Sequence, residues 1–155
     1  MSRPRSDALA AVEEIAAGDH HLAVVSTVRT DGTVQSSVVN AGILADPVSG
    51  DPVVGFVTYG RAKLANLRRR PRATVVFRAG WRWIAVEGRC DLAGPDDRLE
   101  GVEPAALPPL LRAVFRAAGG QHDDWDEYDR VMAEQRRTAV LVHPERVYSN
   151  PERSS

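Results

Sequence analysis

A chain of 155 residues with 43% hydrophobic and 26% charged residues is long enough to form one globular domain with a buried core. No segment approaches the roughly 18 consecutive apolar residues of a membrane span, and the N-terminal segment shows no apolar run typical of a signal peptide. The single cysteine, Cys90, excludes an internal disulfide bond. We therefore expect a cytoplasmic protein without a membrane partner.

Positive charge is concentrated in one segment, although the formal net charge of the chain is only −1. Residues 52–86 contain eight Lys or Arg and no acidic residue, whereas the segments on either side contain more acidic than basic residues. Such a segment in a slightly acidic chain indicates an anionic partner. Lys63 is the only lysine among twenty basic residues. It is either a chance survivor of a GC-rich codon bias or a site that needs a compact ammonium group.

Apolar periodicity and turn residues predict a mainly β chain with several helices. In chain order we expect a helix over 7–17, strands over 22–28, 34–44 and 53–58, a short helix over 62–70, strands over 73–78 and 83–90, helices over 107–118 and 123–137, a strand over 138–143, and a possible short strand within 144–148. Gly88, inside a predicted strand, indicates a bulge or a close backbone approach. Mostly antiparallel strands with tight turns predict a barrel or a sandwich.

The most informative segment runs from Gly55 to Leu67, where a strand leads through Gly60 directly into a helix. The first turn of a helix has unpaired N–H groups and a partial positive charge, so acidic residues are favoured there. This helix begins instead with Arg61 and Lys63. The pattern is typical either of a solvated basic loop or of an anion site, in which N–H groups, a guanidinium and an ammonium converge on a phosphate.

The motifs around this segment resemble the pyridoxamine-phosphate-oxidase-like, FMN-binding split-barrel family. Residues 56–71 combine a Phe-x-Thr strand, a basic turn and a helix ending in Leu-x-x-x-Pro, and 83–88 read Trp-x-x-Val-x-Gly. The resemblance covers residues 7–148 and includes the opening hairpin and the closing strand. It implies an α+β, mainly β fold: an antiparallel, six-stranded Greek-key split barrel. We expect a single domain over 1–155, with a helical insertion at about 104–137.

Within this family, the branch that uses the deazaflavin coenzyme F-420 is the most similar. The Arg61-x-Lys63 pair, the arginine-rich helix and the GC-rich composition resemble actinobacterial members. F-420 carries a phosphodiester and an acidic oligoglutamate tail, which suit the basic segment better than FMN does. FMN members place an Arg near position 37 and a Lys near positions 40–41, where this chain has no charge. The resemblance implies an oxidoreductase that transfers a hydride between F-420 and an unsaturated small molecule. An FMN flavoprotein and a non-catalytic F-420 carrier are the alternatives.

The resemblance also implies roles for individual residues. Arg61 and Lys63 hold the cofactor phosphate, and Val57 and Thr58 flank the ribityl chain. Trp83 stacks on the cofactor or walls its pocket across a dimer, with core or interface packing as the alternative. The residues that line the ring and the ribityl chain are Gln35, Ser36, Ser37, Val38 and Val39. Family members are typically two-fold dimers, so we expect a homodimer with the cofactor at its interface.

Signatures of other functions are lacking. The four histidines and Cys90 show no metal-ligand spacing, so we expect no metal site. His20-His21 is interpreted as a cap of the first helix. The run Arg68-Arg69-Arg70 is not interleaved with stacking aromatic residues and the chain is not basic overall, so we expect no nucleic-acid partner. No nucleophile motif or glycine-rich dinucleotide loop is present, and the sequence names no catalytic residue.

Overall fold

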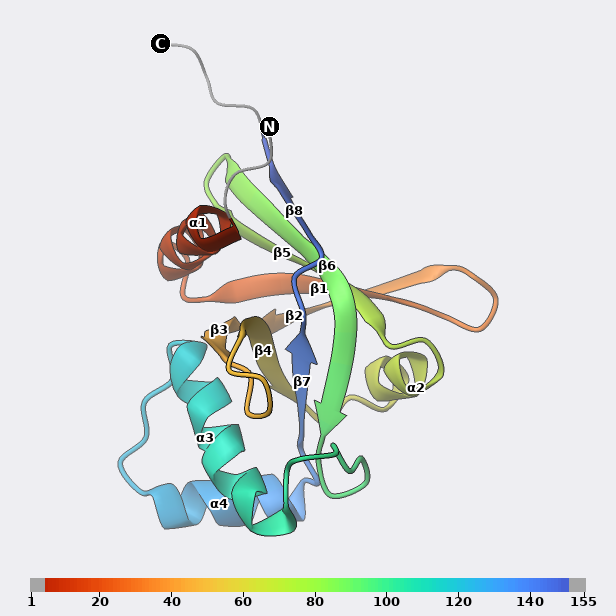
Figure 1. The fold of residues 1–155 in the computed structure, drawn as a ribbon, viewed down its shortest axis with the longest axis vertical. Coiled ribbons are helices and arrows are strands. Elements are labelled where there is room, and N and C mark those ends of the chain that lie inside the picture. Colours follow the sequence, from red (N-terminus) through yellow and green to blue (C-terminus); the bar gives the residue numbers. More distant parts are fainter. Residues whose placement is uncertain (1–4, 151–155) are drawn as a thin grey trace.

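The computed structural model describes residues 5–150, in which helices surround one antiparallel sheet (Figure 1). The elements are α1 (Arg5–Ala17), β1 (Leu22–Val28), β2 (Val34–Asn40), β3 (Gly42–Ala45), β4 (Pro52–Thr58), α2 (Arg61–Arg69), β5 (Arg72–Ala79), β6 (Arg82–Ala93), η1 (Pro104–Ala106), α3 (Leu107–Ala117), α4 (Trp125–Glu134), β7 (Thr138–Val142) and β8 (Arg146–Ser149). Among the described residues, no helix has the length and apolar character needed to span a bilayer.

The long strand β6 joins the two halves of the sheet. Its first part pairs with β5 on one edge and with β8 on the other, and its last part, Cys90–Ala93, pairs with β7. The sheet follows the order β2-β1-β5-β6-β7-β4-β3, with β8 beside β6. The two ends of this path are not joined by ladder hydrogen bonds, so the barrel is split. The predicted antiparallel split-barrel fold is confirmed, with eight strands in place of six.

One of the additional strands arises because the predicted strand over 34–44 is interrupted. The N–H of Ala41 donates to the carbonyl oxygen of His21 at 2.9 Å, and the chain then leaves β1 to pair with β4 as β3. Gly42 allows this change of direction, because a Cβ atom there would lie 1.9 Å from the carbonyl oxygen of Ala117 in α3. The prediction of one continuous strand was wrong because this contact is between distant parts of the chain.

Two apolar clusters form the core on either side of the split sheet. One packs α1 against the sheet and includes Val12, Val25 and Phe77. The other packs α3 and α4 against β4 and β7 and includes Val114 and Leu141. Figure 1 shows α3 and α4 together at one end of the molecule, while α2 lies beside the β1–β2 hairpin. This second cluster holds the helical segment predicted at 104–137 over one end of the sheet.

The backbone crosses closely over Gly88, as the sequence predicts. A Cβ atom at this position would lie 1.7 Å from the carbonyl oxygen of His143, in the connection from β7 to β8. The N–H of Glu145 also donates to the carbonyl oxygen of Glu87 at 2.9 Å, so the crossing chain is held against β6. A side chain at Gly88 would therefore separate β8 and β7 from the strand that joins the two halves.

We predict that Gly88→Ala lowers the free energy of unfolding by about 3 kcal/mol, because the new methyl group displaces backbone rather than a flexible side chain. Urea denaturation followed by circular dichroism measures this change. Gly60→Ala is the matched control, since the backbone there has φ −67° and a Cβ atom would meet its nearest neighbour at 3.5 Å. Equal stability of the two variants would contradict this account of the crossing.

Candidate functional site

The turn from β4 into α2 brings hydrogen-bond donors together. Gly60 is the N-cap residue of α2. The first helical hydrogen bond runs from the N–H of Leu64 to the carbonyl oxygen of Gly60 at 3.0 Å. The preceding N–H groups of the first turn therefore have no partner within the helix. The Thr58 hydroxyl accepts from the N–H of Gly60 at 3.1 Å and from Lys63 Nζ at 3.4 Å. No acidic residue occurs in this first turn.

Lys63 is a buried cation without a carboxylate partner among residues 5–150. The residue is only 8% exposed, and its ammonium lies 5.7 Å from the centroid of the Phe56 ring. Burial lowers the pKa of Lys63, and no neighbouring negative charge opposes that shift. A buried, unpaired charge destabilises a folded protein unless a ligand neutralises it. The described part of the chain therefore leaves the Lys63 ammonium without a counter-charge.

A cavity of about 920 Å³ opens beside this ammonium. Its walls come from the ends of β2 and β4, the end of α3, and one face of α4. Apolar side chains such as Val114, Val131 and Met132 form much of the surface, and His122, Glu127 and Arg137 add polar groups. A concave, largely apolar site with a few placed charges is typical of binding sites for small organic molecules.

The structure brings half of the predicted site residues together. Those that line the cavity are Val38, Val39, Val57, Thr58 and Lys63. Those that do not line it are Gln35, Ser36, Ser37, Arg61 and Trp83. The residues of the first group come from three separate elements, β2, β4 and α2, so the fold rather than the sequence order creates their proximity.

The remaining predicted residues of β2 contact other parts of the hairpin and α2. Gln35 Oε1 accepts from Asn66 Nδ2 at 3.2 Å, and the same amide group donates to Thr27 Oγ1 at 3.1 Å. The Ser36 and Ser26 hydroxyls are 2.9 Å apart. Ser37 Oγ is buried without a hydrogen-bond partner. In this structure Gln35 therefore positions α2 through Asn66 rather than facing the cavity.

Arg61 and Trp83 lie outside the cavity for different reasons. Arg61 is the first residue of α2 and its side chain is exposed. Trp83 lies near the start of β6 and packs edge-to-face on Tyr148 of β8, with ring centroids 6.1 Å apart. Within one chain Trp83 is thus part of the sheet surface, and its predicted place beside a cofactor requires a second copy.

The basic segment is partly neutralised by acidic residues from other segments. Arg68 forms a two-pronged ion pair with Asp97, at 2.8 and 2.6 Å. The other two ion pairs join Arg72 to Glu145 and Arg82 to Glu14. Arg69 donates to the carbonyl oxygen of Val28 at 2.7 Å.

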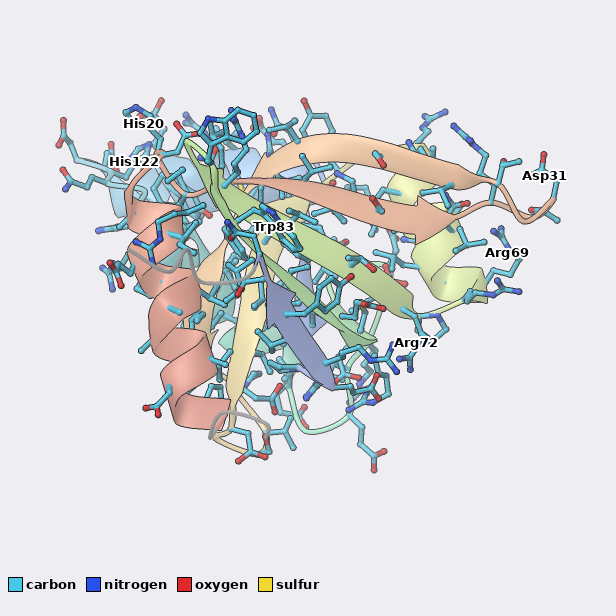
Figure 2. The ribbon with its side chains drawn as sticks, turned by 90° about the horizontal axis from the view of Figure 1, so that it is seen from above. His20, Asp31, Arg69, Arg72, Trp83 and His122 are labelled. Carbon is cyan, nitrogen blue, oxygen red and sulfur yellow. The ribbon has the colours of Figure 1, made fainter. Side chains whose placement is uncertain are left out.

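Figure 2 shows Arg69 and Arg72 on the side of the molecule that also carries the β1–β2 turn at Asp31. Several charges of the segment are therefore already paired within the chain.

Sequence reasoning missed polar residues at the other end of the cavity. His20 and His122 lie together at one end of the molecule, opposite Asp31 (Figure 2), and both line the cavity. His20 and its neighbour His21 have positive φ angles of 57° and 56°, and they turn the chain from α1 into β1. This position agrees with the interpretation of His20-His21 as a cap of the first helix. The N–H of Asp124 donates to His122 Nδ1 at 3.0 Å, which leaves Nε2 as the protonated nitrogen of the neutral ring.

The helical wall of the cavity is stabilised by aromatic packing. The rings of Phe115 and Tyr128 have centroids 4.9 Å apart, and Trp125 packs edge-to-face on both. The Tyr128 hydroxyl donates to the carbonyl oxygen of Leu111 at 3.1 Å, and burial raises its pKa to about 12. Tyr128 is therefore a poor proton donor at neutral pH and joins α3 to α4.

Comparison with known proteins identifies the family to which this fold belongs. The family model described as pyridoxamine 5'-phosphate oxidase matches residues 9–150. The chain belongs to the pyridoxamine 5'-phosphate oxidase family. This membership agrees with the split barrel and confirms the resemblance inferred from the motifs.

Solved structures with the same fold have low sequence identity to this chain. A conserved hypothetical protein of Mycobacterium tuberculosis aligns with a TM-score of 0.64 at 20% identity, over 100% of this chain and 92% of its own. A pyridoxamine 5'-phosphate oxidase-related, FMN-binding protein of Nostoc punctiforme aligns with a TM-score of 0.64 at 15% identity, over 96% and 86%. A protein described as an F420 reductase aligns with a TM-score of 0.53 at 19% identity, over 82% and 88%. These likenesses show the shared fold.

We predict that Lys63→Met stabilises the chain by about 1 kcal/mol without ligand at pH 7, because it removes a buried, unpaired charge and keeps the stem volume. The folded-state pKa of Lys63 is lowered, so its penalty is present at neutral pH and fades as pH rises through that pKa towards 10.5. The difference between variant and wild type in urea denaturation should shrink over the same range. A Lys63→Met variant with a lower free energy of unfolding than the wild type would instead show that the ammonium stabilises the folded chain.

Proposed function

We propose that this chain is an oxidoreductase that transfers a hydride between coenzyme F-420 and an unsaturated small organic molecule. The observation that carries the proposal is the buried, unpaired ammonium of Lys63 at the edge of a large apolar cavity. Membership of the family and the shared fold with an F420 reductase support it. In this proposal the anionic part of the cofactor binds at the Lys63 ammonium.

The residues present fit a phosphodiester at the start of α2. Lys63 Nζ and the free N–H groups of the first turn provide donors for its oxygens, and the adjacent helix dipole favours negative charge. Val38, Val39 and Val57 are placed to pack against the ribityl chain and ring. When bound, F-420 supplies the hydride through its deazaflavin ring. The aromatic wall formed by α3 and α4 would keep water from that ring.

Two features favour F-420 over FMN. The segment from Gln35 to Asn40 carries no charged side chain, so β2 adds no cation to hold the phosphate of FMN. Arg61 is exposed beside Lys63 and is available to the acidic tail of F-420. An FMN flavoprotein of the same fold is the alternative, supported by the family match and by the FMN-binding protein of Nostoc punctiforme. A protein that only carries F-420 is a further alternative.

We predict that the purified protein binds F-420 tightly and that Lys63→Ala weakens this binding by about 1.5–3 kcal/mol, roughly tenfold to a hundredfold, because a charge-assisted bond is lost. Fluorescence titration with F-420 and, separately, with FMN measures both affinities. Arg130→Ala is the matched control: Arg130 is an exposed cation of α4, outside the basic segment and not among the residues that line the cavity.

Each outcome of this titration has a distinct meaning. Equal F-420 affinity of wild type and Lys63→Ala would remove the site assignment. Tight binding of FMN alone would replace the proposed cofactor by the alternative. Tight F-420 binding without hydride transfer to any of a panel of unsaturated acceptors would favour the carrier. Failure of the wild type to bind either cofactor would overturn the proposal.

We further propose that the protein is a homodimer that closes the cavity at its interface. Exposed apolar side chains gather on one face of the sheet, over β1, β2 and β8: they are Leu22, Val24, Val34, Val38 and Tyr148. Cross-strand pairing aligns Val38, Val24 and Val76 in one row of this face. An exposed apolar patch of this kind is typical of a protein–protein interface.

The apolar face and the cavity meet at Val38. Its side chain is 64% exposed, and it also lines the cavity. A second copy seated on this face would therefore cover both the sheet and the mouth of the cavity. Trp83 lies on the same face, beside Tyr148, where it is available to the cavity of the other protomer.

We predict that Val24→Glu shifts the protein from dimer to monomer, because two like charges would be buried in the interface. Sedimentation equilibrium measures the mass in solution. Val48→Glu is the control, since Val48 is an exposed valine in the loop between β3 and β4, away from this face. A wild type that is monomeric at high concentration, or a Val24→Glu variant that remains dimeric, would contradict the proposed interface.

A further inference from the structure

A second group of ionisable side chains lies apart from the cavity, where the two halves of the sheet join. Asp46 follows β3, Asp91 belongs to β6, and His143 follows β7. One ligand atom from each lies within 4.8 Å of the others. The spacing of these residues along the chain carries no metal motif, so their proximity arises only from the fold.

Asp46 is the most unusual member of this group. The residue is 4% exposed, and its Oδ1 atom is buried with no hydrogen-bond partner. Its Oδ2 atom accepts from the N–H of Val48 at 3.1 Å, and from the N–H and the hydroxyl of Ser49 at 2.8 and 3.1 Å. These hydrogen bonds outweigh burial, so the pKa of Asp46 is lowered and the group carries a negative charge. A buried carboxylate oxygen without a partner calls for a positive group.

The free oxygen faces the other two side chains. Asp46 Oδ1 lies 3.8 Å from His143 Nε2, too far for a hydrogen bond. His143 Nε2 lies 2.7 Å from Asp91 Oδ2, while Asp91 Oδ1 accepts from Arg89 at 2.5 Å. Arg89 therefore occupies one oxygen of Asp91 and leaves the other directed towards His143. The Asp91 and His143 side chains are only partly buried, so solvent reaches the group.

We propose that Asp46, Asp91 and His143 form a binding site for a divalent first-row transition cation such as Zn²⁺. Two carboxylates and an imidazole match the ligand preference of this class, and three protein ligands leave one position for water. Zinc bonds of about 2.0–2.1 Å place ligand atoms roughly 3.3 Å apart, so small rotations of the three side chains suffice. The cation replaces the proton between His143 and Asp91 and gives Asp46 Oδ1 its missing partner.

A cation at this place would link three segments of the chain, the loop after β3, strand β6 and the connection after β7. The loop after β3 belongs to one end of the sheet path, while β6 and the connection after β7 belong to its middle. Cys90, next to Asp91 in β6, packs in the apolar core, and its Sγ atom is not part of the group formed by Asp46, Asp91 and His143. The site therefore has only nitrogen and oxygen ligands. Binding at this site stabilises the folded chain by mass action.

Titration of tag-free, chelator-treated protein with Co²⁺ and with Zn²⁺ tests the proposal without any organic cofactor. We expect one Co²⁺ per chain, a visible ligand-field spectrum without a thiolate charge-transfer band, displacement by Zn²⁺, and a higher Tm with either metal. Asp46→Asn and Asp91→Asn should each weaken binding by about tenfold or more. Asp46→Asn retains an amide oxygen for the N–H groups of Val48 and Ser49, so the loop keeps its turn. His143→Gln should act in the same direction.

Asp51→Asn is the matched control, because Asp51 carries the same charge in the same loop but is exposed and outside the group. Its affinity should equal that of the wild type. Circular dichroism and the Tm in chelator confirm that each variant is folded. A wild type that binds neither Co²⁺ nor Zn²⁺, equal affinity of Asp46→Asn and wild type, or a preference for Mg²⁺ or Ca²⁺ would each overturn the proposal. Because the cavity takes no part in this assay, its outcome is independent of the proposed oxidoreductase function.

Discussion

The ammonium of Lys63 is held where both burial and the dipole of its own helix disfavour a positive charge. Neither of its contacts removes that cost. The Thr58 hydroxyl already accepts from Gly60, and its 3.4 Å distance to Nζ is long for a hydrogen bond to a charged group. The ring of Phe56 offers only a weak cation–π attraction at 5.7 Å. The described part of the fold supplies no counter-charge for this ammonium, so the proposed anionic cofactor would neutralise it at the turn from β4 into α2.

The split in the barrel explains why a cavity lies beside this ammonium. The strand β6 continues through both halves of the sheet, whereas β2 and β4 approach each other without ladder hydrogen bonds. Residues at the ends of β2 and β4 line one side of the cavity, and α3 and α4, from the segment between β6 and β7, form the other. The contact between Gly42 and the carbonyl of Ala117 holds α3 against this end of the sheet. The cavity therefore results from the order of the strands, and the turn after β4 places the Lys63 ammonium beside it.

The sequence predicts much of this fold and only part of the site, for a physical reason. Alternating apolar residues, turn glycines and Pro71 report local preferences, and the strands and helices they predict are present. The break at Ala41 was missed because it depends on α3, more than seventy residues further along the chain. His20, His122 and Arg137 were missed as cavity residues because they lie in turns without periodicity. Lys63 was found because its charge contradicts a local rule at a helix start, which is visible without tertiary information.

Buried polar atoms without partners mark the places where this fold departs from its most stable arrangement. Among the described residues, two buried side-chain oxygens have no hydrogen bond, Ser37 Oγ and Asp46 Oδ1, and Lys63 has a single long one. A sequence selected only for stability would replace or pair such groups. Lys63 and Asp46 carry opposite charges in separate parts of the molecule, so each favours a ligand of the opposite sign. Because a ligand that binds only the folded state stabilises it, the stability of the bare chain understates its stability under conditions where both ligands are present.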